Sequence, residues 1–183
     1  MKAVLLDWAT MGPDLDTSEL RALLPELEIY DETGDEEIAE RIAGAAIVLG
    51  NKITISETLF ANAPEMRFIG LTATGTDNID LAAAKKHGVA VANIRAYCTQ
   101  SVVEHVFGCL LGLTHSLRDY ADDVRGGKWQ GAGSFCMLTH PIDELSAMTL
   151  GIVGYGELGR AVARIAAAFD MEVIVAARPG SAD

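Results

Sequence analysis

Basic side chains are scarce in this sequence, and their scarcity excludes several kinds of partner. Lys and Arg number 14 against 26 Asp and Glu, which gives a net charge of −12 over 183 residues. Since no basic stripe is present to neutralise phosphates, nucleic acid is not an expected partner. The same acidity disfavours binding to an anionic membrane surface.

Long apolar runs and paired cysteines are also missing. No run approaches the roughly 18 apolar residues of a membrane span, and the opening MKAVLLDWAT is too short in apolar residues for a signal peptide. The three cysteines, Cys98, Cys109 and Cys136, are odd in number and lack metal-ligand spacing. We therefore expect reduced thiols in a cytoplasmic protein without a metal site.

The first half of the sequence alternates between strand and helix patterns. Helical patterns occupy 17–24, 35–43 and 78–87, and Asp77 or Asn78 is the expected cap of the last one. Alternation of this kind predicts an α/β fold with a parallel sheet covered on both faces. Short apolar segments predict five strands, at 3–7, 27–30, 46–50, 67–71 and 89–93.

The pattern changes after the fifth predicted strand. Residues 99–117 carry a long helix pattern with apolar residues on several faces, which predicts burial between two units. A glycine-rich, irregular arm follows at 126–145 and contains Trp129 and Phe135. An apolar segment of this kind often packs on another subunit.

A strand pattern then leads into GIVGYGELG, which has the spacing G-x-G-x-x-G at Gly154, Gly156 and Gly159. A helix pattern at 157–169 and a strand pattern at 172–177 follow, as a dinucleotide-binding βαβ unit requires. Here the glycines allow a tight turn, backbone approach to a pyrophosphate, and close packing of helix on strand. The alternative is a βα turn that uses glycine for geometry alone.

The end of the second strand bears on the choice of cofactor. An acidic residue normally accepts hydrogen bonds from the adenosine ribose of NAD about 20 residues after the glycines. Here that position holds Ala177, and Arg178 follows. Because an arginine attracts a 2′-phosphate, NADP(H) is favoured and NAD(H) is possible. The alternative is that Arg178 is a solvated surface side chain and that the pocket accepts either cofactor.

Several segments together resemble the D-isomer-specific 2-hydroxyacid dehydrogenase family. They are ATGTDNIDLAAAKKHGVAVAN, YCTQSVVEH and ELSAMTLGIVGYGELGRAVAR, and SFCMLTHPIDELSAMTLGIVG is similar to the glycerate dehydrogenase/hydroxypyruvate reductase type. The resemblance implies a flavodoxin-like substrate-binding domain at 1–98 and a connecting helix and dimerisation arm at 99–147. It also implies the first βαβ part of a Rossmann domain at 148–183, with the active site in the cleft between the two domains.

The resemblance also implies binding roles. In TATGT, the N–H groups of Thr74 and Gly75 would hold the substrate carboxylate. The loop leaves the carboxyl end of a strand and is expected to enter a helix N-terminus, which favours anions; an ordinary glycine turn is the alternative. Val102 would lie near the nicotinamide, although a valine there is also a plausible core residue.

The resemblance also implies cofactor contacts at the glycine turn and after the second strand of the βαβ unit, some of them through backbone groups. The residues concerned are Gly154, Tyr155, Gly156, Glu157, Leu158 and Gly159 around the pyrophosphate, and Ala177 and Arg178 at the ribose.

In this family three residues from the second half of the nucleotide domain complete the chemistry. An arginine orients and polarises the 2-keto acid, a histidine donates or takes the proton, and a glutamate paired with it adjusts the pKa of the histidine. None of the four histidines, His87, His105, His115 and His140, matches that position, so no catalytic residue is expected within 1–183. We expect the sequence to be the front part of a longer protein, inactive when isolated.

The function implied is NAD(P)-dependent interconversion of a small 2-keto acid, such as hydroxypyruvate or glyoxylate, with its D-2-hydroxy acid, by a homodimer. The alternative is a dinucleotide-sensing, non-catalytic interaction protein on the same fold, as in the corepressor branch of the family. A third reading, a methyltransferase, is disfavoured by the phosphate-spaced glycines and the leading domain.

Overall fold

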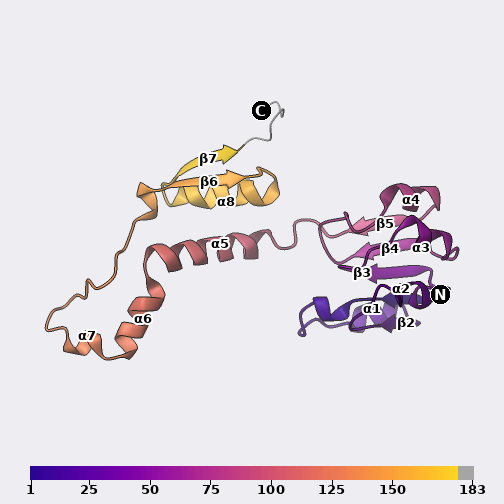
Figure 1. Cartoon of the computed structure of the whole chain (residues 1–183), viewed down its shortest axis with the longest axis horizontal. Helices are drawn as coiled ribbons and strands as arrows, with labels where there is room; N and C mark the ends of the chain where they lie inside the picture. The colour runs from indigo at the N-terminus through magenta and orange to yellow at the C-terminus, as the bar shows by residue number, and fades with distance from the viewer. Residues whose placement is uncertain (177–183) are drawn as a thin grey trace. The chain divides into compact units, whose positions relative to one another are not determined.

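The structure is a computed structural model that describes residues 1–176. The chain divides into two compact units, the first ending at Arg95 and the second beginning at Ala96 (Figure 1). Within the described residues, no helix has both the length and the apolar character to cross a bilayer.

The first unit is built on a five-stranded parallel sheet of order β2-β1-β3-β4-β5. This is the flavodoxin-like order, and the α/β fold expected from the alternating pattern is confirmed. All five predicted strands are present, each trimmed by one or two residues. They are β1 (Ala3–Leu5), β2 (Leu27–Ile29), β3 (Ile47–Gly50), β4 (Phe68–Leu71) and β5 (Ala90–Asn93).

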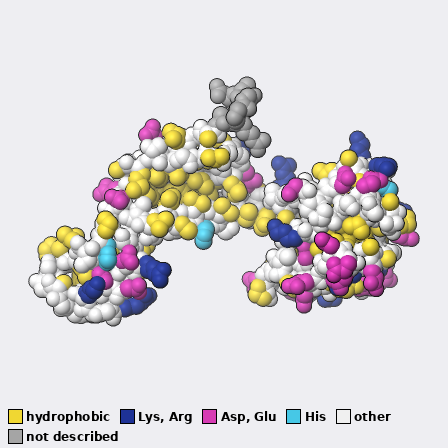
Figure 2. Space-filling model, viewed as in Figure 1, with side chains coloured by type: hydrophobic (Ala, Val, Ile, Leu, Met, Phe, Trp, Pro, Cys, Tyr) yellow, Lys and Arg dark blue, Asp and Glu magenta, His cyan; other side chains and the backbone are white. Residues whose placement is uncertain are grey.

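Helices cover this sheet unequally. The larger core lies on one face, where Ile38, Phe60 and Ala83 pack with Val48 and with other strand residues. These three come from α2 (Ile38–Arg41), α3 (Glu57–Ala61) and α4 (Leu81–Lys86). A smaller core on the other face is formed under η1 (Trp8–Thr10) and α1 (Ser18–Leu23). Figure 2 shows acidic side chains gathered over this unit, many of them from the segment 14–40.

Helix α4 begins later than the sequence pattern predicts. The side chain of Asp80 caps it by accepting a hydrogen bond from the N–H of Ala83 at 2.9 Å. The expected caps, Asp77 and Asn78, are therefore wrong. Asn78 instead donates its amide to the carbonyls of Asn51 and Ile53, because the parallel bridge at Ile55 and Ile79 brings the two loops together.

The second unit contains α5 (Thr99–Thr114), α6 (Leu117–Arg125), α7 (Lys128–Gly131), η2 (Leu145–Ala147), β6 (Thr149–Val153), α8 (Glu157–Ala168) and β7 (Glu172–Ala176). The predicted helix at 99–117 ends early, because Ser116 adopts a left-handed φ of +48°. The arm expected to be irregular contains the short helix α7.

Helix α5 packs on α8 to form the core of the second unit, where Figure 2 shows hydrophobic side chains gathered. The rings of Phe107 and Phe169 stack there with centroids 5.3 Å apart. Strands β6 and β7 are parallel and flank α8, which makes the βαβ unit that the glycine motif predicts. The sheet residues Val153 and Ile174 are exposed, so one face of this two-stranded sheet is open.

Candidate functional site

The TATGT loop begins where β4 ends, at the carboxyl edge of the five-stranded sheet. The N–H of Thr72 donates to the carbonyl of Gly50 at 2.9 Å, which ties the loop to the end of β3. On the other side the loop is tied to the end of β5. There the N–H of Ile94 donates to the carbonyl of Ala73 at 3.1 Å, and the Asn93 amide donates to the carbonyl of Thr74 at 2.7 Å.

These contacts use carbonyls of the loop and leave several of its N–H groups unused, including the two that the sequence predicts to bind a carboxylate. In the part of the chain that the structure describes, the N–H groups of Thr74 and Gly75 have no hydrogen-bond acceptor, and both residues are exposed. Two adjacent donors of this kind are available to hydrogen-bond a carboxylate.

The helix N-terminus expected beside this loop lies elsewhere. Helix α4 starts at Leu81, five residues after Thr76, and its cap is the Asp80 carboxylate. The argument that a helix dipole supports an anion at Thr74 and Gly75 is therefore wrong. Any anion affinity of the loop comes from the peptide N–H groups themselves.

The glycine turn between β6 and α8 has the geometry that its spacing predicts. Gly154 has a φ of +94°, a conformation that side-chain-bearing residues rarely adopt. A Cβ atom on Gly159 would overlap the carbonyl oxygen of Gly154 and lie 3.3 Å from Cγ2 of Ile152. The first and third glycines are thus required by the turn and by the close packing of helix on strand.

Gly156 is different, because the fold itself does not require it. Its φ is −77°, and no atom of residues 1–176 lies within 4 Å of the place where a Cβ would stand. The first hydrogen bond at this end of α8 runs from Arg160 N–H to Gly156 C=O, so the N–H groups of Glu157 and Leu158 precede it. Open space beside unpaired N–H groups at a helix N-terminus fits a pyrophosphate.

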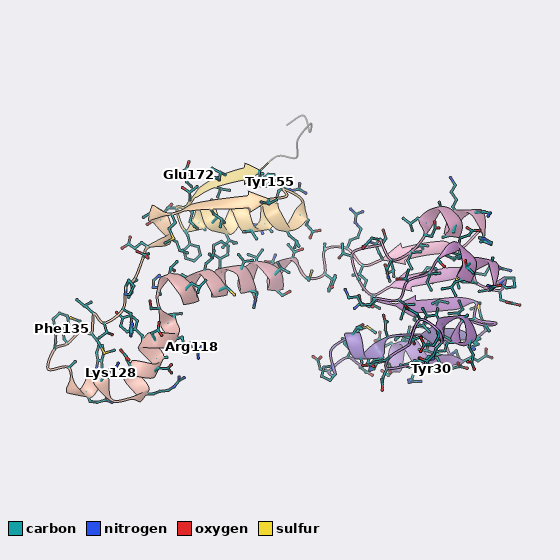
Figure 3. All side chains as sticks on the ribbon, viewed as in Figure 1. Tyr30, Arg118, Lys128, Phe135, Tyr155 and Glu172 are labelled. Atoms are coloured by element: carbon teal, nitrogen blue, oxygen red, sulfur yellow. The ribbon has the colours of Figure 1, made fainter. Side chains whose placement is uncertain are left out.

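The other residues predicted to contact the cofactor differ in their exposure to solvent and in their contacts. Tyr155 is half exposed at the turn (Figure 3), and Val102 is half-buried in the first turn of α5. The Glu157 carboxylate accepts a hydrogen bond from the Thr99 hydroxyl, which links α8 to α5. Ala177 and Arg178 lie outside the described residues.

Each histidine has a local contact of the kind expected for a structural residue. His87 pairs with Glu57 at 3.1 Å, and His105 lies 3.6 Å from the sulfur of Cys109. His115 is the C-cap of α5. His140 pairs with Asp123 at 3.0 Å. Within residues 1–176, no three metal-binding side chains cluster as ligands.

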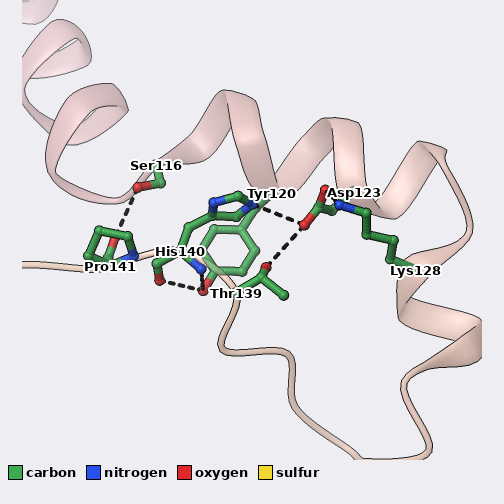
Figure 4. Close-up of polar contacts among 7 residues, drawn as sticks. All are labelled: Ser116, Tyr120, Asp123, Lys128, Thr139, His140 and Pro141. Atoms are coloured by element: carbon green, nitrogen blue, oxygen red, sulfur yellow. Dashed lines mark hydrogen bonds and ion pairs between the residues drawn. The ribbon is translucent and has the colours of Figure 1, made fainter.

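The arm is held to α6 by a polar cluster centred on Asp123 (Figure 4). This carboxylate is only 7% exposed and accepts hydrogen bonds from Lys128 at 2.5 Å and from Thr139 at 3.0 Å, beside its pair with His140. The Lys128 ammonium, aided by His140 and Thr139, lowers the pKa of Asp123 despite its burial. The Tyr120 hydroxyl donates to the carbonyl of His140 at 2.8 Å.

Sequence reasoning misses two residues at the carboxyl edge of the sheet: Asp7, which holds the loop after β3, and Asn93, which holds the TATGT loop. Asp7 is a buried carboxylate, and its oxygens accept hydrogen bonds from Asn51 N–H at 2.9 Å and from Lys52 N–H at 2.6 Å. Asn93 is the other. Both lie at or just beyond the carboxyl end of a predicted strand, which is the signal that points to them.

Comparison with known proteins places this geometry in a family. The family model described as "D-isomer specific 2-hydroxyacid dehydrogenase, catalytic domain" matches residues 7–178. The chain is 42% identical over 139 residues to glycerate dehydrogenase from Methylorubrum extorquens, a match that covers 76% of this chain and 44% of that protein. It is 38% identical over 178 residues to hydroxypyruvate reductase from Blautia hydrogenotrophica, covering 95% of this chain and 55% of that protein.

A solved structure matches as well. The D-lactate dehydrogenase of Aquifex aeolicus, complexed with NAD and lactic acid, superposes with a TM-score of 0.70 and 26% identity. That match covers 95% of this chain and 50% of the other. The chain thus spans about half the length of the proteins it matches.

Proposed function

Because the chain belongs to the D-isomer-specific 2-hydroxyacid dehydrogenase family, we propose that the whole protein interconverts a small 2-keto acid and its D-2-hydroxy acid. Hydroxypyruvate and glyoxylate are the proposed substrates. The similarity to a glycerate dehydrogenase and a hydroxypyruvate reductase supports this choice. The observation that carries the proposal is the pair of N–H groups at Thr74 and Gly75 that have no protein acceptor among the described residues.

In the proposed mechanism, Thr74 and Gly75 hold the substrate carboxylate through their N–H groups. This contact fixes one end of the acid, so that the carbonyl carbon is presented in one orientation. A nicotinamide cofactor, when bound at the glycine turn, would supply the hydride chemistry. The proton transfer is assigned to the family's histidine, with the glutamate adjusting its pKa and the arginine orienting the 2-keto acid, all outside this sequence. Residues 1–183 alone are therefore expected to be inactive.

We propose that the glycine turn binds the cofactor pyrophosphate at the N–H groups of Glu157 and Leu158, with Gly156 leaving the space for it. Val102 and Tyr155 are the further proposed contacts. NADP(H) is proposed as the preferred cofactor, supported by Ala177 and Arg178, where an acidic residue would repel the 2′-phosphate.

The whole protein is proposed to be a cytoplasmic homodimer. The domains are proposed to be 1–98 for substrate, 99–147 for the connecting helix and dimerisation arm, and 148–183 for the start of the cofactor domain. The exposed Phe135 on the arm (Figure 3) supports a contact with a second copy, and so does Leu138, which is also exposed. Three cysteines without disulfide partners support a reducing compartment.

Steady-state kinetics of the full-length protein would test the function. We expect kcat/KM for hydroxypyruvate or glyoxylate to be roughly tenfold higher with NADPH than with NADH, as one charge-assisted hydrogen bond allows. Equal or better activity with NADH would contradict the role of Arg178. Binding of either dinucleotide without turnover of any 2-keto acid would instead identify a dinucleotide-sensing protein.

A further inference from the structure

The two N–H groups of the proposed carboxylate site belong to peptides whose carbonyls are held by the end of β5. The peptide between Ala73 and Thr74 presents its carbonyl to the N–H of Ile94 at 3.1 Å. The next peptide, between Thr74 and Gly75, presents its carbonyl to the side-chain amide of Asn93 at 2.7 Å. Each peptide that offers an N–H is therefore anchored through its own oxygen.

Peptide planarity gives this arrangement a consequence. In a trans peptide the C=O and the N–H lie in one plane and point in opposite directions. A donor that fixes the carbonyl of Thr74 therefore also fixes the direction of the N–H of Gly75. In the same way, Ile94 fixes the direction of the N–H of Thr74.

We propose that Asn93 is a positioning residue for the substrate: it orients the Gly75 N–H toward the 2-keto acid carboxylate and strengthens it as a donor. This inference rests on the proposed function. A carbonyl that accepts a hydrogen bond polarises its peptide, which makes the N–H on the other side a better donor. A peptide fixed in advance also loses less freedom when the substrate binds.

The location of Asn93 explains why its side chain reaches the loop. Asn93 pairs with Leu71 in the last register position of β4 and β5, and the loop starts at the next residue after Leu71. Because a carbonyl oxygen only accepts hydrogen bonds, the atom facing Thr74 has to be the amide nitrogen. Aspartate at this position has no such donor when ionised, and leucine has none at all.

The test uses Asn93→Leu in the full-length protein, with Asn62→Leu as the matched control. Asn62 also donates its amide to a backbone carbonyl, that of Thr58 at 3.0 Å, but it does so at the end of α3. The probes are glyoxylate with NADPH in steady-state kinetics and oxamate, an unreactive 2-keto acid analogue, in equilibrium binding.

For Asn93→Leu we expect KM for glyoxylate and Kd for oxamate to rise about fivefold to tenfold. This is less than the loss of a whole hydrogen bond to a charged ligand, because the Gly75 N–H remains but is no longer held in direction. The kcat value is expected to change by less than about twofold, because the carboxylate is held equally in the ground and transition states. The Kd for NADPH is expected to stay unchanged, and Asn62→Leu is expected to leave KM unchanged.

A second variant and a spectroscopic measurement separate positioning from simple loss of structure. Asn93→Ala removes the same donor without adding apolar bulk, and it replaces Asn93→Leu if that variant fails to fold. In protein labelled with ¹⁵N-glycine, oxamate is expected to shift the Gly75 amide signal strongly in the unaltered protein and weakly in the variant.

Unchanged KM and oxamate affinity in a folded Asn93 variant would overturn the positioning role while leaving the proposed function intact. If the unaltered protein neither reduces glyoxylate and hydroxypyruvate nor binds oxamate, the proposed function and this inference both fall.

Discussion

Gly159 in the first turn of α8 lies so close to the carbonyl of Gly154 that no side chain fits between them. The contact joins the start of the helix to the end of β6, and it fixes where the helix N-terminus points. Because Gly156 lies between these two glycines, the same contact also sets where the open space beside Gly156 lies.

Substituting Gly159 with alanine is expected to lower the free energy of unfolding by about 1–3 kcal/mol, because the added methyl overlaps backbone that cannot move aside. Gly112→Ala in α5 is the matched control, since no atom of the described part of the chain lies within 4 Å of a Cβ there. That control is expected to be neutral or to stabilise by about 0.5–1 kcal/mol. Thermal unfolding measures both, and equal midpoints would contradict the packing role of Gly159.

Gly156→Ala separates the dinucleotide interpretation from a purely structural turn. Because the position has an ordinary φ and open space around it, the unfolding free energy is expected to change by less than about 0.5 kcal/mol. The methyl would, however, occupy space proposed for the pyrophosphate. We expect the Kd of NADPH, measured by fluorescence titration of the full-length protein, to rise by at least about tenfold. An unchanged Kd would favour the structural turn.

Asp7→Asn is expected to destabilise the first unit by roughly 2–3 kcal/mol, because an amide NH₂ would face the N–H donors of Asn51 and Lys52 inside a buried site. The control is Asp14→Asn at an exposed position on the same unit. Urea unfolding followed by circular dichroism gives both values. If the unfolding free energies of the two variants differ by less than about 0.5 kcal/mol, Asp7 does not stabilise the loop after β3 that contains Asn51 and Lys52.

Acid is expected to weaken the arm through Asp123. Its pKa is lowered in the folded state, chiefly by Lys128, so the unfolded chain takes up this proton first as the pH falls. The stabilisation is therefore complete above about pH 4 and is lost as the pH falls through the lowered pKa.

This pH dependence of stability is checked by thermal unfolding of the Asp123→Asn variant at several pH values, with Asp122→Asn as the neighbouring control. Asp122 is exposed and pairs only with Arg125 among the described residues. The gap in melting temperature between the unaltered protein and Asp123→Asn is expected to shrink as the pH falls from about 6 to about 3. A gap that is constant over this range would refute the contribution of the ionised carboxylate.

The sequence by itself determined the five strands of the first unit and the βαβ unit of the second. Buried parallel strands need short, continuous apolar segments, and these are visible without a structure. The glycine motif was equally readable, because its requirement for Gly at 154 and 159 is local to one turn. Family membership followed from the same segments.

Only the tertiary structure showed which residues hold the loops at the carboxyl edge of the sheet, where the candidate site lies. Asp7 is 44 residues from Asn51, and Asn93 is 19 residues from Thr74, so neither contact leaves a trace in local periodicity. Each depends on the parallel register, which brings the carboxyl ends of β1, β3, β4 and β5 to one edge. The cap of α4 was also decided there: Asp77, Asn78 and Asp80 are all good capping residues, and the bridge between Ile55 and Ile79 leaves Asp80 as the one that caps the helix.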